Sequence, residues 1–406
     1  MQVLIYDLVL FFYRFGILLA SLFNAKAKLW VEGRNHWQNK LSNFQWGKNK
    51  RIWIHCSSLG EFEQARPLIE KLKSQEPQAQ IILTFFSPSG YEIRKNYEHT
   101  DAVMYLPHDT KTNAKAFLDL IKPDVALFVK YEFWFHYLDA LKKRNIPTVL
   151  FSSVFRKEQL FFKWYGEFFR NMLQLFSKIF VQNENSKLLL QSISVASEVS
   201  FDTRFDRVYQ VAQNRTQFPL IDKFKGNSKV LIAGSTWQKD EELLVQLINK
   251  NILSDYKFII ALHDIDLKRI ADLQNKLSAK SVLLSKLNNE NTSTAQIIFV
   301  DSIGSLSSLY AYAEIAYVGG GFNAGIHNVL EAVVYNTPVI FGPHYYKSEE
   351  AKDLLALGEA FSISSFTELK TAFQTASTKT NCASRKYVEE RLGGTEKVIA
   401  YLGILC

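Results

Sequence analysis

The chain has 406 residues, of which 47% are hydrophobic and 22% charged, with 18 Gly and 9 Pro. These proportions exclude a disordered, collagen-like or low-complexity protein and predict two or three globular domains. The net charge is +8, with eight Lys and Arg against two acidic residues in residues 1–60, and the three widely spaced cysteines argue against a disulfide framework or a structural zinc site.

The first predicted element is residues 3–23, which are apolar apart from Asp7, Arg14 and a few small or hydroxyl side chains. A helix of this length can just span a bilayer core, although a mid-helix Arg costs about 2.5–3.5 kcal/mol there. We interpret residues 1–30 as a membrane anchor that either lies in the interface or spans once, with the following basic residues meeting an anionic membrane surface. The lack of a preceding Lys or Arg argues against a signal peptide. The alternative is a buried first helix of a globular domain.

From residue 50, strand-like apolar runs alternate with helical segments, a rhythm that predicts parallel, doubly wound sheets. The predicted strands are 51–56, 80–86, 102–106, 125–129, 148–153, 178–182, 229–234, 256–263, 281–285, 296–301, 315–320 and 337–342. A polar segment interrupts the rhythm. We therefore predict α/β domains at 31–211 and 229–406, the second with C-terminal helices, joined by a linker at 212–228. Ligands are expected in a cleft at the carboxyl ends of the strands.

Within the first predicted domain, residues 53–69 run from a strand through Ser57-Ser58-Leu59-Gly60 into a helix that opens with Glu61. Gly60 is expected to let the backbone turn tightly, and Glu61 at the helix start is positioned to accept a proton. The helix dipole is expected to keep this carboxylate ionised. In general, however, an acidic residue at a helix start is more often only a dipole partner.

The segment 155–176 mixes four basic residues with many aromatic residues. Such a mixture suits a surface that receives the acyl chains and phosphates of a lipid. The alternative is an ordinary helix whose apolar face is core. No recognisable nucleic-acid reading module surrounds the segment, so no nucleic-acid partner is expected.

The second predicted domain contains two candidate nucleotide-binding segments. Ser235 and Thr236 lie between a strand and a helix, where hydroxyl and amide groups suit a phosphate. Residues 318–344 place a glycine-rich turn between a strand and a predicted helix carrying His327, Asn328 and Glu331. Glu331 is expected to bind the two hydroxyls of a nucleotide ribose.

Together, blocks 53–69, 301–320 and 325–343 resemble the Kdo transferases, the 3-deoxy-D-manno-octulosonic acid transferases of lipopolysaccharide synthesis. The segments YLPHD at 105–109 and YEFW at 131–134 follow in the expected order, and the resemblance covers nearly the whole chain. It implies a GT-B fold of two doubly wound, Rossmann-like domains facing a central cleft. It also implies transfer of Kdo from CMP-Kdo to a lipid A precursor (lipid IVA), with inversion and without metal or other cofactor, at the cytoplasmic face of the inner membrane.

When the family's functional residues are matched to this sequence one by one, the resemblance assigns Glu61 as the general base. It assigns CMP contacts to the following residues: Ile303, Gly304, Ser305, Asn328, Val329, Leu330 and Glu331. Where the family often has an arginine-containing run, this chain has His263, which is expected to replace the arginine. The family usually has two acidic residues before the Trp, and this chain keeps only Glu132. At Ser305 the family usually has Glu, so here the main chain is expected to bind the nucleotide instead.

In this hypothesis Glu61 takes the proton of the attacking acceptor hydroxyl, and CMP leaves. Ser235, Thr236, Arg204 and His263 are expected to meet the phosphate charge. Further candidates for acceptor or phosphate contacts are Ser57, Ser58, Gly60 and Glu132. The alternatives are a GT-B enzyme with a UDP-sugar donor and a non-enzymatic protein that binds the membrane periphery.

Overall fold

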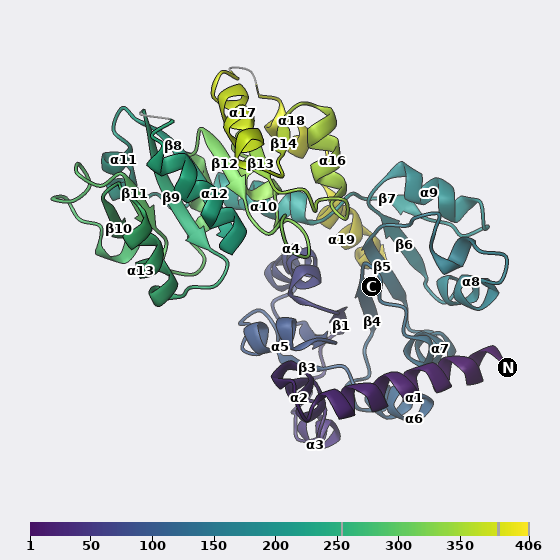
Figure 1. Ribbon diagram of the computed structural model, residues 1–406. Coiled ribbons are helices and arrows are strands. Elements are labelled where there is room, and N and C mark those ends of the chain that lie inside the picture. The colour runs from purple at the N-terminus through teal and green to yellow at the C-terminus, as the bar shows by residue number, and fades with distance from the viewer. Residues whose placement is uncertain (253–254, 380–381, 405–406) are drawn as a thin grey trace. The chain divides into compact units, whose positions relative to one another are not determined.

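The computed structural model describes residues 1–252, 255–379 and 382–404, and the chain divides into two compact units. Unit 1 comprises Met1–Arg207 and Arg391–Cys406, and unit 2 comprises Val208–Glu390. Each unit is built around one seven-stranded parallel sheet with helices on both faces (Figure 1). The predicted doubly wound α/β class is therefore confirmed for both halves of the chain, while the central cleft stays a prediction.

The sheet of unit 1 has the strand order β3-β2-β1-β4-β5-β6-β7. Its strands are β1 (Arg51–Cys56), β2 (Gln80–Phe85), β3 (Ala102–Tyr105), β4 (Val125–Val129), β5 (Thr148–Ser153), β6 (Lys178–Val181) and β7 (Glu198–Val199). Its helices are α1 (Gln2–Ala20), α2 (Ala25–Glu32), α3 (Trp37–Ser42), α4 (Leu59–Gln75), α5 (Pro88–Arg94), α6 (Lys111–Ile121), α7 (Phe135–Lys143), η1 (Leu160–Phe162), α8 (Glu167–Leu173), α9 (Glu184–Gln191) and α19 (Gly394–Ile404), and α10 (Arg204–Gln213) begins here. The sequence analysis missed only the two-residue β7 among these strands.

Strand β1 is buried on both faces, as expected for a central strand of a parallel sheet. Ile52 and Ile54 pack with Phe62 of α4 on one face, while Trp53 packs with Phe117 of α6 on the other. This alternation follows from the period-two geometry of a strand. The same packing fixes the loop after β1, and with it the start of α4.

The sheet of unit 2 has the order β10-β11-β9-β8-β12-β13-β14. Its strands are β8 (Lys229–Thr236), β9 (Tyr256–Leu262), β10 (Ser281–Leu283), β11 (Ile297–Phe299), β12 (Ile315–Val318), β13 (Val339–Phe341) and β14 (Ala360–Ser362). Its helices are α11 (Pro219–Lys225), α12 (Gln238–Asn249), α13 (Leu267–Lys276), η2 (Leu284–Lys286), α14 (Leu306–Leu309), η3 (Tyr310–Tyr312), α15 (Leu330–Val333), α16 (Glu349–Ala356), α17 (Phe366–Ser377) and α18 (Ser384–Glu389). Among these strands, β14 was not predicted.

Two predicted boundaries differ from the structure. The segment 212–228 is not only a linker, because α11 lies within it and buries Ile221 and Phe224. The second unit does not extend to residue 406, because α19 packs on α4 and places Val398 and Leu402 in the core of unit 1. The amide of Thr395 also donates to Asp206 of unit 1 over 2.6 Å.

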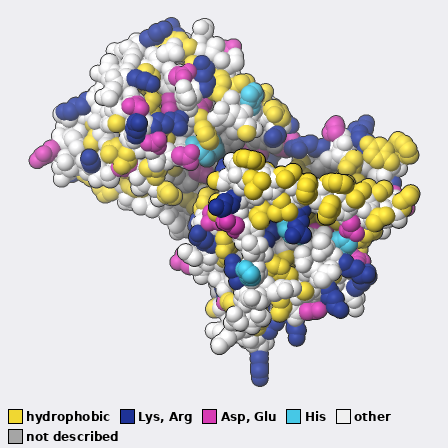
Figure 2. Space-filling view, turned by 60° about the horizontal axis from the view of Figure 1, so that its bottom comes forward, with side chains coloured by type: hydrophobic (Ala, Val, Ile, Leu, Met, Phe, Trp, Pro, Cys, Tyr) yellow, Lys and Arg dark blue, Asp and Glu magenta, His cyan; other side chains and the backbone are white. Residues whose placement is uncertain are grey.

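Helix α1 contacts the rest of unit 1 through one narrow stripe of residues. Its half-buried residues, Val3, Tyr6, Leu10 and Ile17, recur at helical spacing, and no residue of α1 is fully buried. The Tyr6 hydroxyl donates to Asp109 over 2.5 Å. The remaining apolar residues form an exposed hydrophobic band (Figure 2). The alternative of a buried first helix is therefore wrong, and by length and composition α1 can cross a membrane.

The segment 155–176 is divided between the core and the surface. Phe155 and Phe161 are buried in the core beside Phe133. Trp164 and Tyr165, in contrast, are 91% and 55% exposed and pack edge to face on each other. Some aromatic residues of this segment are therefore part of the core, while Trp164 and Tyr165 lie on the surface.

Candidate active site

Each sheet contains a point at which the chain reverses its direction of strand addition. In unit 1 this switch point lies between β1 and β4, and in unit 2 between β8 and β12. Loops at the carboxyl ends of such strand pairs diverge and leave a crevice in which α/β proteins bind ligands. Most of the predicted site residues follow β1, β4, β8 or β12, so the topology groups them by unit.

In unit 1, Glu61 is the third residue of α4 and forms a capping box with Ser58. Its Oε2 atom accepts hydrogen bonds from the Ser58 amide over 2.8 Å and from the Ser58 hydroxyl over 3.2 Å. Burial and the nearby charge of Glu132 raise the pKa of Glu61 to about 7, although Lys130 and Ser58 act in the opposite direction. A carboxyl group with this pKa is well matched to proton transfer at neutral pH.

Two expectations for this turn are wrong. The helix dipole does not keep Glu61 ionised below neutral pH, because burial and Glu132 outweigh it. Gly60 does not make a special turn: it is the second residue of α4, has no left-handed φ, and a Cβ there would meet only Ser58 Oγ at 3.9 Å. The capping box itself turns the chain, and Ser57 and Ser58 lie half-buried beside it.

Glu132 follows β4 and is 95% buried, since its exposed fraction is 5%. Its Oε2 atom accepts a hydrogen bond from Trp134 Nε1 over 2.6 Å and lies 2.9 Å from His55 Nε2. The other ring nitrogen of His55 lies 2.8 Å from the Thr84 hydroxyl. This network holds the Glu132 carboxyl in one place, close enough to influence Glu61.

Arg204, predicted as a phosphate contact, is paired with a buried carboxylate. Its guanidinium donates to Asp202 over 2.9 Å, and Gln64 of α4 donates to the same Asp202 oxygen over 2.7 Å. Burial alone raises the pKa of Asp202, but the charge and hydrogen bonds of Arg204 lower it overall. Arg204 is therefore fixed near α4, and its contact with a ligand phosphate stays a prediction.

In unit 2, Ser235 has a left-handed φ of 54° at the end of β8, and the buried Thr236 donates its hydroxyl to Glu241 over 3.2 Å. Behind them, the ring of His263 stacks between Trp237 and His327, with centroids 4.5 Å apart on each side. Burial and His263 lower the pKa of His327 to about 4, so its ring is neutral at physiological pH. The stack supplies a flat aromatic wall at the β8–β12 switch point.

In unit 2, a residue that follows the first predicted CMP-contacting block, Ser307, contacts the second block. Glu331 accepts hydrogen bonds from Ser307 over 2.6 Å and from Asn328 over 3.2 Å, which joins α14 to the loop before α15. Val329 and Leu330 are fully buried, so neither residue exposes a side chain to a ligand. The other block, Ile303 to Ser305, forms an exposed turn in which Ile303 is 94% exposed and Gly304 has a φ of 93°.

The predicted helix carrying His327, Asn328 and Glu331 is shorter than expected. Only Glu331 lies in α15, because the Asn328 side chain accepts from the Leu330 amide and holds the preceding residues as a loop. No group of three or more His, Cys, Asp or Glu suited to a metal ion occurs among the residues that the structure describes. Independence of metal stays a prediction.

Sequence reasoning missed the roles of His55, Trp134 and Asp202. Each carried a signal: His55 is a polar residue in an otherwise apolar buried strand, and Asp202 is followed within two residues by Arg204. Trp134 was noted only as the last residue of the YEFW segment at 131–134. Their hydrogen bonds join different strand ends and therefore follow from the fold rather than from local spacing.

Comparisons with known proteins agree with this geometry. Residues 35–207 match the family model described as 3-deoxy-D-manno-octulosonic-acid transferase (kdotransferase). The chain is 26% identical over 352 residues to the 3-deoxy-D-manno-octulosonic acid transferase of Rickettsia bellii, covering 83% of each chain. It is 28% identical over 347 residues to a bifunctional glycosyltransferase/methyltransferase of Fusobacterium nucleatum, covering 81% of this chain and 53% of that protein. The chain thus spans about half the length of the bifunctional relative.

Among solved structures, UDP-GlcNAc 2-epimerase from Neisseria meningitidis matches with a TM-score of 0.58 and 17% identity, covering 86% of this chain and 98% of that chain. At this identity the match shows the fold alone. Two doubly wound units with ligand-suited loops at their switch points define the GT-B architecture of glycosyltransferases. Within that class, residues 35–207 match the family of 3-deoxy-D-manno-octulosonic acid (Kdo) transferases, and curated Kdo transferases are similar to most of the chain.

Proposed function

We propose that this protein is an inverting glycosyltransferase that transfers Kdo from CMP-Kdo to a lipid A precursor, lipid IVA, in lipopolysaccharide synthesis. The observation that carries the proposal is Glu61, a carboxyl group at the β1–β4 switch point with a pKa of about 7. The similarity to Kdo transferases supports Kdo as the sugar, and Glu61 offers the chemistry that such a transfer needs.

In the proposed reaction, Glu61 accepts the proton of the attacking acceptor hydroxyl. The hydroxyl oxygen forms a bond to the anomeric carbon of Kdo as the bond to the CMP phosphate breaks. Ser58 keeps the carboxyl group oriented through its amide, and Glu132 makes that group more basic. The group is thereby strong enough to take a proton at neutral pH, and it is half ionised there.

The donor is proposed to bind in unit 2. Glu331, oriented by Ser307 and Asn328, binds the ribose hydroxyls, and the exposed turn at 303–305 supplies main-chain contacts. Ser235 and His263 bind the phosphate that becomes negatively charged as CMP leaves. The hydroxyl of Thr236 already donates to Glu241, which favours its neighbour Ser235 as the phosphate donor.

We further propose that α1 lies in the membrane interface at the cytoplasmic face rather than spanning the bilayer. Asp7 Oδ1 lies 2.6 Å from His136 Nε2, and the Tyr6 hydroxyl donates to Asp109. These contacts attach one face of α1 to the rest of unit 1. Its opposite face exposes only apolar side chains such as Ile5, Val9 and Phe12, as expected of an interfacial helix. The exposed Trp164 and Tyr165 are a second candidate contact with the lipid headgroups.

The test is nucleotide release by the full-length protein in detergent. With CMP-Kdo and a tetra-acylated lipid A precursor, CMP is expected, and its release should require both substrates. Glu61→Gln should release little CMP while still binding it, whereas Glu63→Gln on the same helix should behave as wild type. Release of UDP from a UDP-sugar instead would identify a different GT-B enzyme, and no release from any nucleotide sugar would favour a purely membrane-binding protein.

A further inference from the structure

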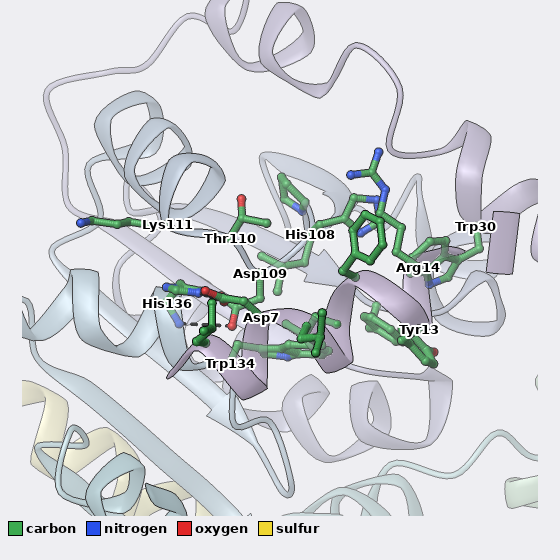
Figure 3. A pocket seen from close by; sticks show the side chains of 17 residues that line it. Asp7, Tyr13, Arg14, Trp30, His108, Asp109, Thr110, Lys111, Trp134 and His136 are labelled. Atoms are coloured by element: carbon green, nitrogen blue, oxygen red, sulfur yellow. Dashed lines mark hydrogen bonds and ion pairs between the residues drawn. The ribbon is translucent and has the colours of Figure 1, made fainter. Parts of the chain in front are cut away.

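A cavity of about 440 Å³ lies in unit 1 beneath α1. It is lined by α1, by Trp30 of α2, by the loop that follows β3 and by residues after β2 and β4, and Figure 3 shows these groups converging. Its volume falls within the range of about 300–1,000 Å³ typical of ligand pockets. The proposed base and donor contacts do not line this cavity, so its purpose is not explained by them.

Much of the cavity wall is apolar. Leu8 and Phe11 of α1 face Phe86, Leu106 and Trp134 of the domain. The rings of Phe86 and Trp134 stack with centroids 5.0 Å apart, which makes one wall flat and stiff. A narrow space between aliphatic and aromatic side chains suits a hydrocarbon chain rather than a sugar.

A buried cation lies behind this wall. Arg34 is 6% exposed, and its guanidinium donates only to main-chain carbonyls, those of Leu106, Trp30 and Phe86, over 2.7–2.9 Å. No carboxylate pairs with it anywhere in the described ranges of the chain. Burial lowers its pKa to about 9, so it remains charged at neutral pH. A buried, unneutralised cation favours an anion nearby.

The cavity wall adds a second cation. Arg14 of α1 lines the cavity and has no ion-pair partner within the residues described. Burial, together with Arg34 and Arg14, lowers the pKa of His108 to about 4, which reports the positive potential at this place. The buried indole Nε1 of Trp30, another wall residue, finds no acceptor within the described residues.

The carboxylates in the wall do not cancel these cations, because both already have partners. Asp7 is paired with His136. Asp109 accepts from the Tyr6 hydroxyl and from the amides of His136 and Tyr137. Burial raises the pKa of Asp109 to about 6 despite these bonds, which weakens its negative charge further. The cavity therefore combines an apolar interior with an excess of positive charge.

The cavity connects the membrane-facing helix with the catalytic carboxyls. Leu4, Leu8 and Phe11 line it and are also 53–71% exposed on α1, so its mouth opens at the proposed lipid surface. At the other side, its wall residue Trp134 donates directly to Glu132, which in turn raises the pKa of Glu61. A lipid chain in this cavity would therefore place the acceptor beside the network that holds Glu132.

We propose that this cavity binds one acyl chain of the phosphorylated glycolipid acceptor, with Arg14 contacting an anionic group at its mouth. The assignment rests on the proposed function and locates its acceptor. Arg34 is a positioning residue that stabilises the anion through space. Charge complementarity and continuity with the apolar band of α1 select this occupant over a neutral lipid.

The test uses a lipid A precursor with a photoreactive diazirine on one acyl chain, added to the full-length protein in phosphatidylcholine nanodiscs. Cross-links are expected at Phe86, Trp134 and residues 106–111. Leu8→Trp, which narrows the cavity, should remove them and raise the KM for acylated acceptor about tenfold, with kcat and the KM for CMP-Kdo unchanged. The matched control, Leu188→Trp, makes the same change at an exposed residue of α9 outside the cavity wall and should alter neither.

Arg14→Gln should weaken cross-linking of the phosphorylated probe about tenfold but not that of its dephosphorylated form. The proposal is overturned if cross-links are confined to the exposed face of α1, or if Leu8→Trp behaves as Leu188→Trp does. Equal cross-linking by a diazirine phosphatidylcholine would also overturn it. Wild-type transfer is measured on the same samples. Absence of transfer there counts against the proposed function, whereas absence of cross-links despite transfer counts against the cavity alone.

Discussion

Replacing Glu61 with Gln removes one ionisable group and changes little else. The Gln side-chain oxygen can still accept from the Ser58 amide, so the capping box and the start of α4 should remain. What disappears is the ability to take a proton from the acceptor hydroxyl. Because positioned general bases contribute about 10²–10⁴-fold, we expect turnover to fall by that factor while CMP binding is unchanged.

The same substitution should stabilise the protein at alkaline pH. The pKa of Glu61 rises from an ordinary 4.5 to about 7 in the folded chain, so between these values the folded state binds more protons and stability falls as pH rises. At 1.36 kcal/mol per pH unit, the full penalty above pH 7 has an upper limit of about 3.4 kcal/mol. Because Glu61 is only half-buried, solvent screening reduces the expected gain to about 1–2 kcal/mol.

The assay compares urea unfolding of wild type and Glu61→Gln at pH 4 and pH 8, alongside turnover. The gain in unfolding free energy should appear at pH 8 and vanish at pH 4. Glu63→Gln is the matched control, because this neighbouring carboxylate is paired with Arg94 and should lose rather than gain stability. A Glu61→Gln variant that keeps more than about a tenth of wild-type turnover, or that is no more stable at pH 8, would refute the reasoning.

Three further predictions concern the same account. Glu132→Gln removes a negative charge beside Glu61, so the acid limb of the pH profile of kcat/KM, expected near pH 7 in wild type, should move to lower pH. Glu331→Ala should weaken CMP binding by about 1.5–3 kcal/mol in calorimetry, with a smaller effect on kcat; an unchanged Kd would remove Glu331 from the donor site. Deleting residues 1–24 should leave a folded protein by circular dichroism that floats poorly with anionic liposomes, and increasingly poorly as salt rises. If the truncated protein floats as well as the full chain, the anchor lies elsewhere.

The fold could be predicted from the sequence because its signals are local. Buried parallel strands such as Arg51–Cys56 read as short apolar runs, and helix starts such as Ser58–Glu61 carry capping residues. The place of α19 could not be predicted. Its contacts with α4 and Asp206 join segments far apart in the chain, and nothing near residue 394 indicates them.

The positions of the candidate residues at strand ends were predictable, but their electrostatics were not. Glu61 and Glu132 stand out at strand ends, yet their mutual effect on pKa depends on distance and burial, which local spacing does not determine. For the same reason the dipole argument gave the wrong direction for Glu61. The anchor helix shows a similar division: its composition predicts a membrane contact, while its attachment through Tyr6 and Asp7 requires the folded domain.

The central claim, transfer of Kdo to a lipid acceptor, is tested most directly by mass spectrometry of the lipid products. Full-length protein is incubated with CMP-Kdo and a tetra-acylated lipid A precursor, and the lipids are extracted. We predict an acceptor that carries added Kdo, with one CMP released for each Kdo transferred, and no such product with Glu61→Gln. Unmodified acceptor after incubation with folded wild-type protein, or a product formed only from a UDP-sugar, would contradict the account.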